Sequence, residues 1–121
     1  MARYVDGYVL PVPKKNVAAY RKMAKAAGKI WKEFGALEFR ECVGDDLNVP
    51  MGMTYQRLLK LKPGETAFFS WIVYKSRADR DRINAKIMKD PRIAAMMPAN
   101  KKPPFDMKRM VMGGFKVLVE A

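Results

Sequence analysis

The most apolar run in the chain is TAFFSWIVY, residues 66–74, and it is apolar on both of the faces that a β-strand would present. Aromatic and β-branched residues dominate the run, which is typical of a strand in the centre of a sheet. A strand that is apolar on both faces has to be covered on both sides. The fold must therefore place one layer over each face of the sheet to which this strand belongs.

Two main helices and three further main strands are predicted around this run. Apolar residues spaced alternately three and four apart predict a helix over residues 17–34, with Gly35 after its last turn. A second helix begins after Ser76 and continues to about Lys89, and a short helix begins at Asp90-Pro91 and is stopped by Pro98. Strands are predicted over residues 3–12, 36–44 and 109–119, with a further short strand before the Pro63-Gly64 turn.

This order of elements predicts a single α+β domain over residues 1–121 with the ferredoxin-like βαββαβ topology. In such a domain the two main helices cover one face of the sheet. The other face of TAFFSWIVY stays apolar, and in a chain of 121 residues a second copy is the simplest cover for it. The sequence therefore predicts a homodimer in which two sheets pack together.

The composition argues against several kinds of catalytic site, metal site and partner. The chain has no histidine and a single cysteine, Cys42, which argues against a Ser-His triad and a zinc site. We expect no metal and no cofactor. The first ten residues lack the apolar stretch of a signal peptide, and no run reaches the roughly 18 apolar residues of a membrane span. Together with the lone cysteine, these features predict a cytoplasmic protein without a membrane partner.

Three charged residues fall on strand faces that are otherwise apolar, namely Asp6, Glu41 and Arg109. A buried charge without a partner costs several kcal/mol. We therefore expect the three to meet in one buried polar cluster, which is either a structural ion pair at the barrel or dimer interface or a ligand-binding or catalytic site. Gly113 and Gly114 weaken the last strand, and Gly113, on the expected face of Arg109, would leave room for such a pocket.

Three further residues are candidates for the same pocket. Ser70 faces opposite to its neighbours Phe69 and Trp71, and either packing or the pocket would explain it; a nucleophilic role would lack a histidine base. Trp71 is a candidate from the same strand. Asp106 precedes the last strand and either caps a turn or reaches the rim of the pocket. The acidic pair in GDD, residues 44–46, indicates a turn rather than a divalent-metal site.

The chain carries 24 Lys and Arg against 12 Asp and Glu, a net charge of +12, so a polyanionic partner has to be considered. Many of these cations lie on the exposed faces of the first helix, and Lys22, Lys25 and Lys29 would be the nucleic-acid contacts. The aromatic residues of this helix lie instead on its apolar stripe, where they could not stack on bases. A solvated basic face is the simpler interpretation.

Several segments together resemble the YbaA-like family of small bacterial proteins of unknown function. They are YVDGYV, VPKKNVAAYRKMA, WKEFGALEFRECVGDD, FSWIVY, MKDPR and, the most specific, PFDMKRMVMGGF at residues 104–115. The resemblance covers nearly the whole chain. It implies a dimeric α+β barrel, a fold shared by small monooxygenases and ligand-binding stress proteins, and it supplies no catalytic residues.

Three functions remain open on this basis. The first is a homodimer with a small-molecule pocket between its sheet and helices, acting as a binder of a small apolar ligand or as a cofactor-free enzyme. The second is an RNA- or DNA-binding protein that uses its basic surface. The third is an interaction protein without a site. Whether the protein is an enzyme is not decided by its sequence.

Overall fold

The computed structural model describes residues 2–97 and 101–121. Along these residues the strands are β1 (Tyr4–Pro13), β2 (Glu38–Val43), β3 (Glu65–Tyr74) and β4 (Val111–Lys116). The α-helices are α1 (Val17–Glu33), α2 (Tyr55–Leu59), α3 (Arg77–Lys89) and α4 (Pro91–Met96), and two 3-10 turns are η1 (Lys14–Asn16) and η2 (Met107–Arg109). None of the helices in these residues is both long enough and apolar enough to cross a membrane.

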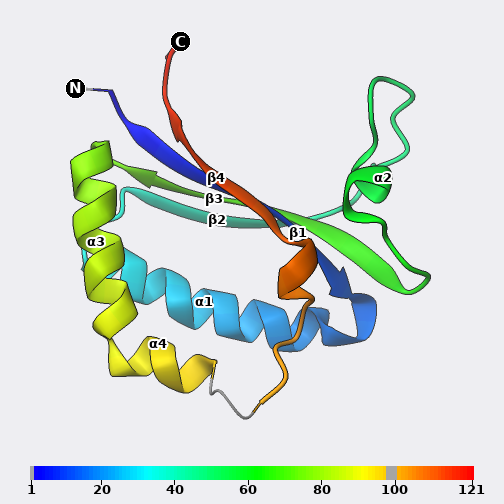
Figure 1. Ribbon diagram of the computed structural model, residues 1–121, viewed down its shortest axis with the longest axis horizontal. Helices are drawn as coiled ribbons and strands as arrows, with labels where there is room; N and C mark the ends of the chain where they lie inside the picture. The colour runs from blue at the N-terminus through cyan, green and yellow to red at the C-terminus, as the bar shows by residue number, and fades with distance from the viewer. Residues whose placement is uncertain (1, 98–100) are drawn as a thin grey trace.

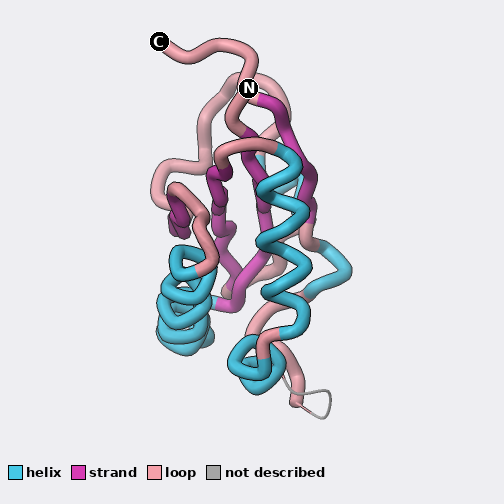
Figure 2. Tube along the Cα trace, turned by 90° about the vertical axis from the view of Figure 1, so that its left-hand side faces the viewer, coloured by secondary structure: helices cyan, strands magenta, loops and turns pink. Residues whose placement is uncertain are grey.

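The four strands form one sheet in the order β2-β3-β1-β4, and every neighbouring pair is antiparallel. This is the predicted ferredoxin-like arrangement, in which β1 and β3 occupy the centre. In Figure 1, α1 lies below the sheet along its length, and α3 stands at the end near the N-terminus. Figure 2 shows the same layers from the side, with α1 seen nearly end-on. The α+β fold predicted from the sequence is confirmed.

The strand register separates the sheet into two faces. The inner face, which the helices cover, includes the row Tyr8, Ser70 and Glu41, because Ser70 pairs with both of the others. The opposite face, called the outer face below, carries Val5, Gly7, Val9, Phe69, Trp71, Val73, Val111, Gly113 and Phe115. In Figure 1 the long helices α1 and α3 leave the outer face open, and the short helix α2 stands at one end of it, where the Tyr55 ring meets Phe69 edge-on.

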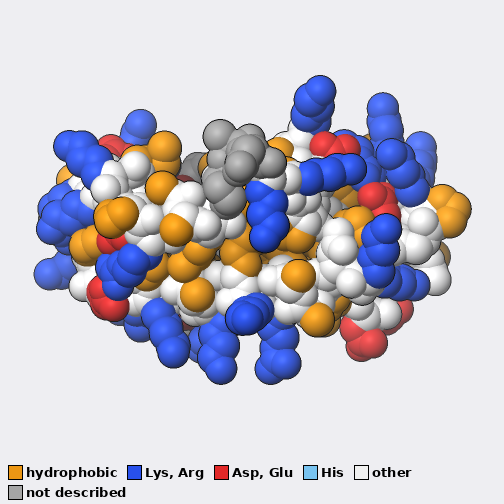
Figure 3. All heavy atoms as spheres, turned by 90° about the horizontal axis from the view of Figure 1, so that it is seen from below, with side chains coloured by type: hydrophobic (Ala, Val, Ile, Leu, Met, Phe, Trp, Pro, Cys, Tyr) orange, Lys and Arg blue, Asp and Glu red, His pale blue; other side chains and the backbone are white. Residues whose placement is uncertain are grey.

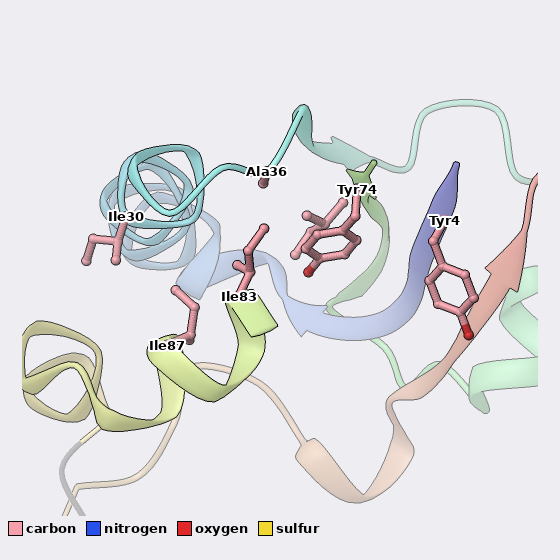
Figure 4. Close-up of a cluster of buried hydrophobic side chains, with 7 residues drawn as sticks. Tyr4, Ile30, Ala36, Tyr74, Ile83 and Ile87 are labelled. Atoms are coloured by element: carbon pink, nitrogen blue, oxygen red, sulfur yellow. The ribbon is translucent and has the colours of Figure 1, made fainter. Parts of the chain in front are cut away.

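The core between the inner face and the helices consists of two clusters. One joins Tyr74 and Ile72 of β3 to Ile83 and Ile87 of α3, and Tyr74 and Ile83 are fully buried (Figure 4). The other joins Leu10 and Phe68 of the sheet to Tyr20 and Ala24 of α1. Each fully buried side chain of this kind stabilises the fold by roughly 1.5–3 kcal/mol. The two clusters hold α1 against the sheet at both ends of the space where Glu41 lies.

The predicted helix ends agree with the structure. Gly35 follows α1 with a φ of +113°, a conformation that glycine adopts without strain. The Ser76 side chain accepts a hydrogen bond from the backbone N–H of Asp79 and so begins α3. Asp90 does the same for α4 by accepting from the backbone N–H of Arg92. The stop predicted at Pro98 lies outside the described residues.

One predicted element and one predicted strand boundary were wrong. The short strand expected before the Pro63-Gly64 turn is the helix α2, because the Thr54 side chain accepts from the backbone N–H of Arg57 and caps its start. The last strand was expected to begin at Arg109, but β4 begins at Val111 and Arg109 belongs to η2. Asp106 starts that turn by accepting from the backbone N–H of Lys108 at 3.0 Å. This turn removes Arg109 from the strand.

Candidate functional site

A cavity of about 180 Å³ lies between the inner face of the sheet and α1. Its walls come from three strands, from α1 and from the segment that leads into β4. Apolar and aromatic side chains make up most of the lining, and the polar groups come from a small number of residues. The lining residues used below are Tyr8, Tyr20, Ala27, Trp31, Glu41 and Ser70.

Glu41 is the acidic residue of this cavity, and two hydroxyl groups bind it. The Ser70 hydroxyl on the neighbouring strand β3 donates to Glu41 Oε1. The Tyr20 hydroxyl on α1 donates to the same oxygen at 2.9 Å. Glu41 Oε2 accepts no hydrogen bond from the residues that the structure describes. One oxygen of the carboxyl group is therefore held in place by the protein, and the other is left for a bound molecule or water.

The surroundings of Glu41 change its acidity. Burial raises the pKa of Glu41, because the ionised form loses hydration, although the hydrogen bonds from Ser70 and Tyr20 act in the opposite direction. Burial, reinforced by the negative charge of Glu41, raises the pKa of Tyr20. Burial also raises the pKa of Tyr8 to about 12. The two tyrosines therefore keep their protons at neutral pH, while Glu41 exchanges its proton closer to neutral pH than an exposed glutamate does.

The cavity adjoins an open groove of about 1090 Å³ between α1 and β2. Tyr20, Phe39 and Glu41 belong to the lining of both, so the Tyr20–Glu41 hydrogen bond lies where the two spaces meet. Gly28 lets α1 approach β2 here, because a Cβ atom at this position would lie 2.8 Å from Cδ1 of Phe39. The groove gives the cavity an opening to solvent beside the edge strand.

The predicted cluster of Asp6, Glu41 and Arg109 does not form. Asp6 is buried on the inner face as expected, but its ion-pair partner is Arg80 of α3, with 3.4 Å between Oδ1 and Nη1. Burial raises the pKa of Asp6, and the nearby Arg80 guanidinium opposes this rise. The Asp6 pair is a second buried polar group, packed between the sheet and α3 and separate from the cavity.

Arg109 lies at a different end of the sheet. Its guanidinium donates to Glu65, with 2.9 Å from Nη1 to Oε1, and to Asp106, with 3.0 Å from Nε to Oδ2. It also donates to the backbone carbonyls of Leu59 and Lys60. Between Ile72, which pairs with Asp6, and Glu65 the strand β3 advances about 23 Å. The predicted cluster with Asp6 and Glu41 was wrong because the face on which a residue lies does not tell how far along the sheet it lies.

The other predicted pocket residues divide between the two faces of the sheet. Ser70 lines the cavity. Trp71 lies on the outer face, where its Nε1 donates to Glu38, and so it is not part of the cavity. Asp106 caps η2, which confirms the capping interpretation and not the rim interpretation.

The two glycines lie on the opposite faces of the sheet from those expected: Gly114, and not Gly113, is on the inner face. Gly113 pairs with Gly7 on the outer face, away from the cavity, and it does not share a face with Arg109 inside a strand. Gly114 pairs with Asp6 on the inner face, and a Cβ atom there would lie 2.7 Å from Cε2 of Tyr4. The space that a glycine provides is therefore filled by the Tyr4 ring, which Figure 4 shows next to β4, and not by a ligand.

Two site residues, Tyr8 and Tyr20, were missed at the level of the sequence. Neither was among the candidate site residues, because Tyr20 lies on the apolar stripe of its helix and Tyr8 on an apolar strand face. A buried tyrosine hydroxyl needs a hydrogen-bond partner, and for Tyr20 this requirement was the available signal. Lys25 and Lys29 line the groove, whereas Lys22 is exposed outside it. Within the described parts of the chain, no three His, Cys, Asp or Glu side chains gather as a metal site would require.

Solved structures with the same fold cover nearly all of the chain. A NIPSNAP family protein with unknown function from Agrobacterium tumefaciens matches with a TM-score of 0.61 and 15% identity, covering 96% of this chain and 88% of its own. A dimeric ferredoxin-like protein from an uncultured marine organism matches with a TM-score of 0.59 and 14% identity over the whole of both chains. The heme-degrader MhuD from Mycobacterium tuberculosis matches with a TM-score of 0.55 and 15% identity over 98% of each chain. At these identities the likeness shows the fold alone.

Sequence comparison gives a nearer relationship. The uncharacterized protein YbaA of Escherichia coli strain K12 is 41% identical over 118 residues, which is 98% of each chain. The protein YbaA of Shigella flexneri matches at the same identity and coverage. The model of a family described as a protein of unknown function (DUF1428) matches residues 3–107. The chain therefore belongs to this family of YbaA-like proteins.

Proposed function

We propose that the protein binds a small, mainly apolar molecule in the cavity between the sheet and α1, with Glu41 as the acid–base group that contacts it. Concave sites lined by apolar side chains with a few convergent polar groups are the usual form of small-molecule sites. The cavity has this composition.

One observation carries the proposal: a half-buried carboxyl group lines an apolar cavity and has one oxygen unused. Glu41 Oε2 has no partner among the described residues and is not fully buried, so a molecule that enters from the groove can reach it. Here Ser70 and Tyr20 both donate to Oε1, and this fixes the group while Oε2 stays available. The raised pKa of Glu41 suits it to transfer a proton to or from a bound molecule. The same site therefore supports a binding protein or a cofactor-free enzyme.

The site belongs, in this proposal, to a homodimer whose sheets pack through their outer faces. Phe69, Val111 and Phe115 of this face are 46%, 45% and 63% exposed in a single chain. A contiguous apolar surface of this kind is rare on monomers. The dimeric state of the marine ferredoxin-like protein supports the same assembly. Closing the outer face would leave the groove and cavity accessible on the helix side.

Nucleic-acid binding is the second candidate, and the net charge of +12 is the observation that favours it. The structure offers it little further support. Tyr20 and Trp31 of α1, and Phe34 directly after it, are buried or half-buried against the core and do not stand among the exposed lysines as stacking platforms. We therefore rank this function below the small-molecule site.

The uncharged dye N-phenylnaphthylamine, whose fluorescence rises in apolar surroundings, tests the proposed site. We expect the protein to bind it, and we expect Ala27→Phe to weaken binding about tenfold or more, because Ala27 lines the cavity and the added ring would fill it. Ala26→Phe is the matched control, since Ala26 is exposed on the same helix and lines neither the cavity nor the groove. Thermal unfolding establishes that both variants fold. Absence of binding, or equal weakening by the two variants, would refute the proposed site.

A further inference from the structure

We infer that the ligand of this site is an amphipathic organic anion, with its charged end in the groove against Arg21, Lys25 and Lys29 and its apolar end in the cavity. The inference rests on the proposed function and specifies the class of molecule that it takes. The shared chemistry is a carboxylate, phosphate or sulfonate group on an apolar body.

The three cations form one wall of the groove. Arg21, Lys25 and Lys29 are spaced four residues apart on α1, so their side chains project from one side of the helix. All three line the groove, as Glu41 does. Figure 3 views the helix side of the molecule and shows Lys and Arg side chains projecting around its periphery, with apolar side chains across its centre. A molecule that reaches Glu41 from solvent through the groove passes this wall.

The carboxylates of the groove do not neutralise these cations. Glu33 pairs with Arg92, at 2.9 Å between Oε2 and Nη2, and Glu38 pairs with Arg40, at 3.5 Å between Oε1 and Nε. Arg21, Lys25 and Lys29 make no ion pair with any residue that the structure describes. Like charges four residues apart on a helix repel one another, and a bound anion would relieve this repulsion. The groove is thus complementary to negative charge.

The positions of the cations set the orientation of such a ligand. Glu41 lines both spaces, but Arg21, Lys25 and Lys29 line the groove alone, so the charged end belongs in the groove against them. The cavity beyond Glu41 is lined mainly by apolar groups such as Trp31, Phe39 and Met110, which suit an apolar body. A polyanion such as nucleic acid would use the cations without the cavity. The continuity of a basic groove with an apolar cavity therefore favours a small amphipathic anion.

A matched pair of dyes separates the charge from the apolar body. Anilinonaphthalene sulfonate carries the same ring system as N-phenylnaphthylamine with one sulfonate added. We expect the wild-type protein to bind the sulfonate about tenfold more tightly than the uncharged dye at low salt, and we expect this preference to shrink as salt rises. The double variant Lys25→Glu/Lys29→Glu should lose the preference and still bind the uncharged dye.

The control is the double variant Lys15→Glu/Lys22→Glu, which makes the same change in net charge at exposed positions outside the groove. It should keep most of the preference. Lys25→Gln/Lys29→Gln serves as a gentler second pair if the charge reversals prevent folding. Equal affinity of the wild-type protein for the two dyes, or equal loss of preference in both charge-reversal variants, would overturn the inference while binding of the uncharged dye upholds the cavity. Failure of the uncharged dye to bind would remove the proposed function and the inference together.

Discussion

Replacing Gly114 by valine is expected to lower the free energy of unfolding by about 1–3 kcal/mol, whereas the same change at Gly113 should cost less than about 0.5 kcal/mol. A side chain at Gly114 would enter the space of the Tyr4 ring, with its Cβ atom 2.7 Å from Cε2 and 2.9 Å from Cζ. Tyr4 is only 9% exposed, and its hydroxyl accepts from Arg80 at 3.3 Å. Displacing the ring would therefore disturb the partner of the buried Asp6 as well.

Gly113 has no such neighbour. A Cβ atom there would lie 3.7 Å from the Phe115 ring on the outer face, which is ordinary contact. Thermal unfolding of both variants, compared at the same state of association, gives the two values. The pair Gly114→Val and Tyr4→Ala provides a double-mutant cycle, in which removing the ring should reduce the cost of the valine. Equal small effects at the two glycines, or an unchanged cost without the Tyr4 ring, would contradict this account of β4.

The second large effect concerns the outer face. Phe69→Glu is expected to raise the dissociation constant of the proposed homodimer at least about 100-fold, because each copy would have to bury an unpaired carboxylate in the interface. Phe69 lies on the central strand β3 and packs edge-on against Trp71. A carboxylate at position 69 would therefore lie among the apolar side chains of the outer face. Analytical ultracentrifugation at micromolar concentration measures the change.

Met88→Glu is the matched control for this experiment. Met88 is an 82% exposed apolar residue on α3, so it presents the same kind of substitution away from the outer face. The control should associate as the wild-type protein does. A wild-type protein that stays monomeric at this concentration would remove the proposed assembly, and a dimer that tolerates Phe69→Glu but not Met88→Glu would move the interface to the helix side.

The sequence was sufficient to predict which residues of one strand share a face. Alternation placed Asp6 with Tyr8, and Glu41 with Phe39, on what proved to be the helix-covered face. These assignments follow from the two-residue period of a strand and need no knowledge of the partners. The order of the elements and the apolar pattern of α1 were sufficient for the fold in the same way.

The partners of these residues could not be predicted in this way. The row that joins Glu41 to Ser70 depends on the register between β2 and β3, which the local pattern does not give. Arg109 was placed in the last strand because its neighbours are apolar, but the Asp106 cap turns the chain before that strand begins. Tyr20 completes the site from α1, and its contact with Glu41 depends on how the helix lies on the sheet.

In the proposed site, Glu41 is a half-buried acid–base group on the wall of a ligand cavity. Carboxyl-carbon NMR of Glu41 across a pH titration tests it directly, with Glu41→Gln to assign the signal. We expect a midpoint above 4.5, the ordinary value for this group, because burial disfavours the ionised form. Between the ordinary pKa and the raised pKa, the native state holds this proton whereas the unfolded chain has released it. The contribution of Glu41 to the free energy of unfolding is therefore fully present below the ordinary pKa and is lost as pH rises through the raised pKa. Bound N-phenylnaphthylamine should raise the midpoint further by excluding water from the cavity, and a midpoint at or below 4.5 that does not move on binding would contradict the claim.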